Sequence, residues 1–285
     1  MAATKGSSLP DDVSPEVRSG SHLVGEDFDD DQLKRWFAEE QEAFYEDDAG
    51  NSEKDPWYAY MRYVNEVLGF ATVSKHADPI QNVLVLGPGS GIEIEQFATK
   101  HPACKLNFLE ASESFKLMLR DRFCGATILE PQYTGSIALS DESQDVVCAF
   151  SVLHHIPNVS KVVTEIGRVT KSGGFLMVRE PCSSMGDWRK PRSATPNERG
   201  ISRALMTRFA ADAGFTLERQ PIPILFEPFN RILKKTIGFR QIPFPILFGL
   251  DRLTSKFLSL NDHYWRDSLW RKLGPSSYFY IFRKL

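Results

Sequence analysis

The chain has 285 residues, of which 42% are hydrophobic, 25% charged and 12% aromatic, and its formal net charge is −3. This composition excludes a wholly disordered, collagen-like or disulfide-scaffold protein, and the length allows one large domain with appendages. Because the chain has no overall basic excess, its charge does not indicate a nucleic-acid partner.

Charge is unevenly distributed between the two ends of the chain. Residues 26–55 carry 13 acidic and 3 basic side chains, a net of −10, whereas residues 219–285 carry 12 basic and 4 acidic side chains, a net of +8. One interpretation is that these ends are solvated or face each other, because surface charge pairs contribute little. The alternative is that the basic end meets an anionic substrate or a membrane surface.

The cysteine pattern predicts reduced thiols. None of the four cysteines lies in a C-x-x-C pair, and no histidine follows at zinc-finger spacing, so we expect a cytoplasmic chain with no metal site. The N-terminus lacks the positive-then-apolar pattern of a signal peptide. The longest apolar stretches are about half the length of a transmembrane helix, so we expect no membrane span.

Two helices are predicted ahead of the main domain. Residues 1–25 mix Ser, Gly, Pro and charges without periodicity, which favours a disordered tail. Within residues 26–75, one helix begins at an N-cap among residues 29–31, and a second runs from Pro56 to near Gly69. We expect this pair to form a helical lid.

From residue 82 onward, short apolar runs alternate with helical patterns. Residues 76–220 therefore predict an α/β core with a doubly wound, mostly parallel sheet. The expected strands are 82–86, 105–110, 126–129, 145–150, 174–179 and 216–220, with a final strand in 276–285 at 277–283. The expected helices are 92–100, 113–123, 159–170 and 201–213.

Residues 221–275, before the final strand, form an apolar insert with interspersed Lys and Arg. We expect it to be a helical insert that covers the core and shapes an acceptor pocket. The alternative is an amphipathic surface that meets a membrane or a lipid-linked sugar.

A glycine-rich turn follows the first predicted strand. The sequence VLVLGPGSG places Gly87, Pro88, Gly89 and Gly91 where a strand passes into a helix, and glycines allow a tight turn and close approach of a ligand. The next strand ends at Glu110, 19 residues after Gly91. An acidic side chain there can accept hydrogen bonds from both ribose hydroxyls of an adenosine.

Two cofactors fit a glycine turn followed by an acidic residue. A dinucleotide-binding turn has its third glycine at the position occupied here by Ile92, and Glu93 and Glu95 at the helix start would repel phosphates. S-adenosylmethionine has a cationic sulfonium and amine and no phosphate. The acidic surroundings therefore favour S-adenosylmethionine, with a nicotinamide-dependent oxidoreductase as the alternative.

Four stretches in this order resemble class I S-adenosylmethionine-dependent methyltransferases: VLVLGPGSG (83–91), LNFLEAS (106–112), SQDVVCAFSVLHHIPN (143–158) and VTKSGGFLMVREP (169–181). The resemblance implies a Rossmann-like, seven-stranded sheet whose last strand is antiparallel. The stretch SMGDWRKPRSATPNERGI (184–201) resembles a bacterial subgroup linked to surface-polysaccharide and other sugar pathways.

The resemblance also implies which residues bind the cofactor. The glycines would line its methionine moiety, the acidic residue would hold the ribose, and the two residues after it would follow the adenine edge. These expected cofactor-binding residues are Gly87, Pro88, Gly89, Gly91, Glu110, Ala111, Ser112 and Ser151.

Two positions depart from the family pattern. Many relatives have Asp where this chain has Val85, and many have Gly-Asp after the third strand, where this chain has YTGSI (133–137). We therefore expect backbone groups near Gly135 and Ser136 to hold the adenine, with Ile137 packed on the ring.

Candidate catalytic residues follow the fourth and fifth strands. An alcohol acceptor benefits from a base, and His154 and His155 lie at the expected carboxyl edge of the sheet. Glu180 is a rival base, and a structural role for the histidines is the alternative to catalysis. In the loop after the fifth strand, Arg179 and Arg189 would bind an anionic group and Trp188 would stack on a sugar ring, unless this loop is only solvated.

The sequence thus predicts an S-adenosylmethionine-dependent methyltransferase that acts on a small molecule, with O-methylation of a sugar or other hydroxylated metabolite as first choice. Alternatives are a lipid-linked or other apolar acceptor, the oxidoreductase, and a non-catalytic S-adenosylmethionine-binding module. We expect no nucleic-acid partner, and peripheral membrane contact through the insert stays open, as does the oligomeric state.

Overall fold

The computed structural model describes residues 12–45, 56–76, 79–187, 197–224 and 243–285. These residues form one eight-stranded sheet in the order β3-β2-β1-β4-β5-β8-β6, with β7 also paired to β8. The strands are β1 (Asn82–Leu86), β2 (Lys105–Leu109), β3 (Thr127–Leu129), β4 (Gln144–Phe150), β5 (Thr170–Pro181), β6 (Phe215–Leu217), β7 (Ile222–Ile224) and β8 (Ser277–Lys284).

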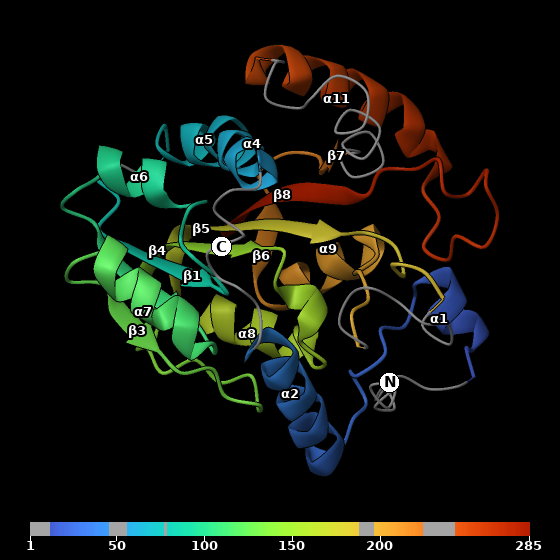
Figure 1. Cartoon of the computed structure of the whole chain (residues 1–285), viewed down its shortest axis with the longest axis horizontal. Coiled ribbons are helices and arrows are strands. Elements are labelled where there is room, and N and C mark those ends of the chain that lie inside the picture. Colours follow the sequence, from blue (N-terminus) through green and yellow to red (C-terminus); the bar gives the residue numbers. More distant parts are fainter. Residues whose placement is uncertain (1–11, 46–55, 77–78, 188–196, 225–242) are drawn as a thin grey trace.

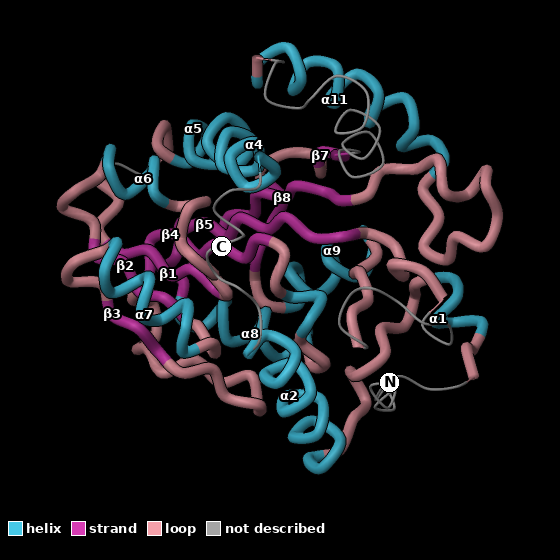
Figure 2. The backbone as a smooth tube through the Cα atoms, viewed as in Figure 1, coloured by secondary structure: helices cyan, strands magenta, loops and turns pink. Residues whose placement is uncertain are grey.

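The first five strands are parallel, and β8 runs antiparallel to β5, β6 and β7. The parallel strands therefore end at one edge of the sheet (Figure 2). This confirms the predicted doubly wound α/β fold with an antiparallel last strand. The predicted count of seven is one too low, because β7 forms from residues that we assigned to the insert.

Helices cover both faces of the sheet (Figure 1). In the core, the helices are α6 (Glu95–Lys100), α7 (Glu113–Arg122), α8 (Val159–Val169) and α9 (Arg203–Asp212). Alternate residues of β1 point to opposite faces, so Val83 and Val85 join one buried cluster while Leu84 and Leu86 join the other. This double burial explains why the strands are nearly continuous apolar runs.

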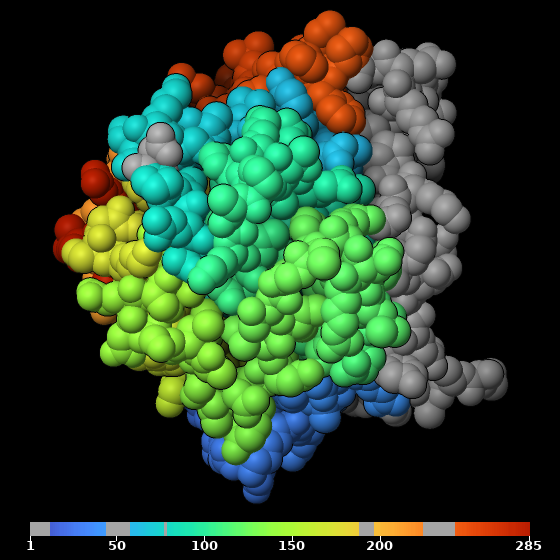
Figure 3. Space-filling view, turned by 90° about the vertical axis from the view of Figure 1, so that its left-hand side faces the viewer, coloured from blue at the N-terminus to red at the C-terminus, as the bar shows by residue number. Residues whose placement is uncertain are grey.

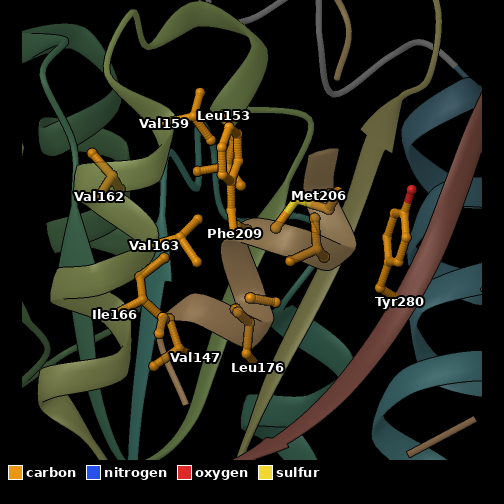
Figure 4. Close-up of a cluster of buried hydrophobic side chains, with 14 of the residues drawn as sticks. Val147, Leu153, Val159, Val162, Val163, Ile166, Leu176, Met206, Phe209 and Tyr280 are labelled. Carbon is orange, nitrogen blue, oxygen red and sulfur yellow. The ribbon is translucent and has the colours of Figure 1, made fainter. Parts of the chain in front are cut away.

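The cluster between the sheet and helices α8 and α9 is shown in Figure 4. Ile166 of α8 is completely buried there, beside Val147 of β4 and Leu176 of β5. Phe209 of α9 fills the space next to them. This contact fixes the direction in which the chain leaves β4 and re-enters β5.

The predicted disordered tail is wrong for residues 12–25. Helix α1 (Pro15–Ser19) begins at Ser14, whose Oγ accepts the N–H of Val17, and ends at Gly20 with φ of 73°. Val17 packs in a small buried cluster with Trp36 and Trp265. Residues 12–25 contain too few apolar side chains to show a helical period. The tryptophans against which Val17 packs come from distant parts of the sequence. Residues 1–11 lie outside the described part of the chain.

The two predicted lid helices are present as α2 (Asp30–Tyr45) and α4 (Pro56–Val64). The second continues through a π-helical stretch, η1 (Asn65–Phe70), into the short helix α5 (Ala71–Val73). α2 and α11 (Phe244–Leu258) lie at opposite ends of the molecule, as Figures 1 and 3 show.

The described part of the insert contains β7, helix α11 and a short helical turn, η4 (Ser259–Asn261). Leu247 and Ser255 of α11 are buried, while Leu253 and Phe257 are more than two-thirds exposed. Among the described helices, none has the length and apolarity that crossing a membrane requires. Peripheral membrane contact stays a prediction, and residues 225–242 of the insert lie outside the described ranges.

Replacing Ile166 by Ala should lower the free energy of unfolding by about 2–5 kcal/mol, because it leaves a cavity in the cluster under α8. Urea denaturation of both proteins measures this difference. Leu117→Ala on the exposed side of α7 is the control and should change it by less than about 0.5 kcal/mol. Equal losses in the two variants would contradict the packing described.

Candidate active site

A cavity of about 650 Å³ opens at the carboxyl edge of the sheet. Its walls come from the ends of β1, β2 and β4 and the segments that follow β1, β2, β3 and β4, from Arg179 within β5, and from the N-terminal helices α2 and α4. α2 contributes Phe37, Glu40 and Gln41, and α4 contributes Tyr58. Within the described residues of the insert, none lines this cavity. The predicted role of the insert in shaping an acceptor pocket therefore has no support from these residues.

The three glycines of the turn have different roles. All three have positive φ, but a Cβ on Gly87 would lie 2.4 Å from Val152 Cγ2, and a Cβ on Gly91 would lie 2.4 Å from Phe123 Cε2. A Cβ on Gly89 would meet nothing within 4 Å. Packing therefore requires Gly87 and Gly91, whereas Gly89 faces open space where a ligand can approach. Gly87, Pro88 and Gly89 line the cavity, and Gly91 does not.

Glu110 is positioned at the end of β2 by backbone hydrogen bonds. Its Oε2 accepts the N–H of Gly89 at 3.1 Å, and its Oε1 accepts the N–H of Ser112 at 2.9 Å. Burial raises the pKa of this carboxyl, and the backbone bonds act in the opposite direction. Glu110, Ala111 and Ser112 all line the cavity beside the glycine turn. The structure thus brings together the residues expected at the cofactor's glycine and ribose contacts.

The residues expected to hold the adenine lie elsewhere. Ile137 is buried in the core under α8, and its N–H donates to Glu165 Oε2 at 3.0 Å. Neither it nor Gly135 and Ser136 lines the cavity; Glu130 and Pro131, directly after β3, do. We correct the expected adenine contact accordingly. The rule that ligands bind where parallel strands end would have selected this earlier pair.

Both histidines after β4 line the cavity, in the short helical turn η2 (Leu153–His155). His154 Nδ1 lies 2.7 Å from Glu180 Oε2, and its Nε2 lies 3.2 Å from Glu198 Oε1. Burial acts to lower the pKa of His154, but the two carboxylates outweigh it and raise this pKa to about 9. His154 therefore belongs to a buried charged network.

His155 is held by the N-terminal helix. Its Nδ1 lies 2.9 Å from Glu40 Oε2 of α2, and its Nε2 lies 3.9 Å from Glu198 Oε1. Burial and the neighbouring His154 lower the pKa of His155. The indole N–H of Trp36 donates to the carbonyl of His155 at 2.7 Å, so α2 contacts both its side chain and its backbone.

Glu180 lies behind His154 and does not line the cavity. It is almost fully buried, and its Oε1 accepts the N–H groups of Val152 and Leu153, both at 2.8 Å. Its other oxygen bonds His154. Because both carboxylate oxygens are engaged and Glu180 itself does not line the cavity, the geometry favours a positioning role for Glu180 over that of a base on the acceptor.

Arg179 lines the cavity, but its guanidinium is bonded to the protein. It donates to Asn65 Oδ1 at 2.8 Å, pairs with Glu93 at 2.9 Å and donates to Ser151 Oγ at 3.2 Å. Burial raises the pKa of Glu93, an effect that Arg179 opposes. Ser151 also lines the cavity, with φ of 58°. Arg179 therefore links β5 to η1 through its hydrogen bond to Asn65. Trp188 and Arg189 lie outside the described residues.

Sequence reasoning missed Glu40 and Glu198, and it placed Arg199 in a basic cluster that would bind an anion. Glu40 lies in an acidic run, which hides it among solvated neighbours. Glu198 and Arg199 lie in the stretch that we interpreted as a basic loop, yet Arg199 is fully buried and donates to the carbonyls of Val24, His154, Ile156 and Pro157. Burial lowers the pKa of Arg199 to about 10.

The charge of the cavity wall favours a cationic ligand. Five glutamates line it against Lys116, Arg179 and His154, whose raised pKa makes it cationic, a formal balance of −2. Lys116 is already paired with Glu113 and Glu130, and Arg179 with Glu93. A pyrophosphate would be repelled here, whereas a sulfonium and an amine would be attracted. The cavity therefore fits S-adenosylmethionine better than a dinucleotide.

Comparison with known proteins agrees with this chemistry. Residues 84–178 match the family model described as a methyltransferase domain. A highly reducing polyketide synthase from Aspergillus sclerotiorum is 25% identical in an alignment 240 positions long, which covers 76% of this chain and 8% of that protein. The chain thus spans less than a tenth of the length of this relative.

Two solved structures share the fold. A putative sarcosine dimethylglycine methyltransferase from Galdieria sulphuraria has a TM-score of 0.52 at 17% identity, over 90% of this chain and 98% of that one. A putative methyltransferase of Haloferax volcanii, solved with a methyltransferase activator, has a TM-score of 0.52 at 14% identity, over 83% and 97%.

The fold, the site and the matched family define a class of enzyme. Residues 84–178 match a methyltransferase domain, and this match, the fold and the cavity support S-adenosylmethionine-dependent methyl transfer with S-adenosylmethionine as the cofactor. The matched domain and the acidic cavity disfavour the oxidoreductase, whereas the non-catalytic S-adenosylmethionine-binding module stays an alternative.

Glu110→Ala should weaken binding of S-adenosylhomocysteine by about 10-fold or more, because a hydrogen bond to a charged group is worth about 1.5–3 kcal/mol. Titration calorimetry of the wild-type and variant proteins gives the two dissociation constants. Asp121→Ala, at an exposed position of α7, should bind like the wild type. Unchanged affinity in Glu110→Ala would show that this carboxylate does not contact the cofactor.

Proposed function

We propose that the enzyme transfers a methyl group to a hydroxyl of a small molecule, with a sugar or another hydroxylated metabolite as the acceptor. The observation that carries this proposal is the order of groups along one cavity. Glu110 follows β2, the glycine turn follows β1, and the histidine pair follows β4. The glycine turn therefore lies between an acidic ribose site on one side and two imidazoles on the other.

The chemistry of methyl transfer explains this order. S-adenosylmethionine supplies an electrophilic methyl group on a sulfonium. The protein's part is to align the acceptor oxygen with that methyl group and to act on the hydroxyl proton. His154 and His155 are polar groups in the part of the cavity wall that follows β4, with Glu40 beside them, and Val152 and Ile156 give this wall apolar surface. An acceptor with a ring and a hydroxyl matches such a wall.

A second candidate acceptor is a lipid-linked or other apolar molecule. Helix α11 exposes Ile246, Leu250, Leu253 and Phe257 along one side, with spacings of four, three and four residues. Such a stripe suits contact with apolar material. This stripe does not line the cavity, so a hydroxylated small molecule remains the first choice.

The test is methyl transfer from radiolabelled S-adenosylmethionine to free sugars, nucleotide sugars, hydroxylated aromatic compounds and lipid-linked sugars. His155→Ala should lower the turnover rate by about 10²-fold or more, the effect expected when a group acting on the acceptor proton is lost. Its affinity for S-adenosylhomocysteine should stay within a few-fold of wild type, because the histidine lies on the acceptor side.

His263→Ala is the matched control, since this exposed histidine does not line the cavity. It should keep wild-type turnover. A His155→Ala variant that is folded and as active as wild type would remove His155 from the reaction. Transfer to an amine or carbon acceptor with no hydroxyl acceptor in the panel would replace O-methylation.

A further inference from the structure

We infer that His154, His155 and Glu198 form a binding site for a divalent metal ion at the acceptor end of the cavity. Nε2 of His154 lies 3.2 Å from Glu198 Oε1, and Nε2 of His155 lies 3.9 Å from the same oxygen. All three ligand atoms lie within 4.8 Å of one another. Ligand atoms about 2.0–2.2 Å from one tetrahedral ion are about 3.3–3.6 Å apart, so small side-chain movements bring these three atoms to coordination distance.

The chemistry of the ligand set fits a first-row transition metal. Two imidazole nitrogens with one carboxylate oxygen suit zinc, iron, cobalt and related ions. Three protein ligands also leave at least one coordination position open. Both histidines line the cavity and Glu198 does not, so an ion held by all three would lie at the cavity wall.

The groups behind the ligands strengthen the inference. Each histidine has its second ring nitrogen on a carboxylate: Nδ1 of His154 on Glu180 at 2.7 Å, and Nδ1 of His155 on Glu40 at 2.9 Å. Metal-binding histidines characteristically have such carboxylate partners, which fix the ring and make the other nitrogen a better ligand. In each pair the other ring nitrogen, Nε2, faces Glu198.

The local charge also matches a divalent cation. The carboxylates that contact the two histidines belong to Glu40, Glu180 and Glu198. Among the contacts described, the guanidinium of Arg199 donates to the carbonyl of His154, so its charge offsets part of that of the carboxylates. Three carboxylates around two imidazoles give the site a negative electrostatic potential, which favours a cationic ligand.

A metal ion here would act on the acceptor. A hydroxyl that binds to a divalent cation loses its proton more readily, because the ion stabilises the oxyanion. The acceptor oxygen then forms a bond to the methyl carbon as the carbon–sulfur bond breaks, and the hydroxyl proton passes to solvent. No oxidant or reductant is needed. This catalytic role rests on the proposed O-methylation, whereas the metal site itself does not.

Cobalt binding to the full-length protein, freed of metal by a chelator that is then removed, tests the site. Co²⁺ should saturate at one equivalent and give visible d–d absorption of a nitrogen and oxygen site, without the charge-transfer absorption of a thiolate ligand. His155→Ala and Glu198→Gln should each weaken Co²⁺ binding by at least 10-fold. Glu40→Gln, which removes only a supporting carboxylate, should weaken it by about 10–100-fold.

Matched controls are His263→Ala and Glu142→Gln, at exposed positions that do not line the cavity. Both should bind Co²⁺ as the wild type does. Thermal unfolding and affinity for S-adenosylhomocysteine establish that each variant is folded. If Glu198→Gln does not fold, the Co²⁺ affinities of Glu40→Gln and His155→Ala still test the site. Absence of one-equivalent binding, or equal binding in all these folded proteins, would overturn the site.

The cobalt titration needs no acceptor, so its result is independent of the proposed function. Binding that is lost in the variants supports the site even when no hydroxyl acceptor is found. Methyl transfer to a hydroxyl that continues at the full rate after chelator treatment would overturn the catalytic role. Transfer that stops and recovers on adding back the metal supports it.

Discussion

The loop after β4 is held in place by two buried groups of opposite charge, and the arrangement of the site depends on them. Glu180 accepts the N–H groups of Val152 and Leu153, and Arg199 donates to the carbonyls of His154, Ile156 and Pro157. A buried charge is tolerated only when its hydrogen bonds are made. Here the two charged groups make hydrogen bonds to the backbone N–H and C=O groups of one irregular turn. These bonds hold the turn in place at the cavity wall.

Helix α2 completes this loop from outside the core domain. Trp36 bonds the carbonyl of His155, its ring lies 4.9 Å from the guanidinium of Arg199, and Glu40 bonds the ring of His155. The N-terminal helix is therefore part of the active-site wall as well as a cover. The contacts of α2 with His155 join residues that are more than 100 positions apart in the sequence.

The glycine turn after β1 also depends on packing against neighbouring segments. Two of its glycines are required because side chains of neighbouring segments, Val152 and Phe123, occupy the space that a Cβ would need. Only Gly89 combines a positive φ with open space, which is the arrangement for close approach of a ligand. A motif that looks uniform in the sequence thus contains two packing positions and one position that faces the cavity.

The sequence by itself determined the parallel sheet, the glycine turn, the acidic end of β2 and the histidine pair after β4. These are local signals: apolar runs with a helix between them, and motifs a few residues long. Only the tertiary structure decided the order of residues 12–25, the entry of β7 into the sheet, and the contacts of Glu40, Glu198 and Arg199 with the histidine loop beside the cavity. Burial and partners decide those roles, and the partners come from positions tens to hundreds of residues away. A charged residue that folds into a buried network has the same local sequence signal as one that stays in water.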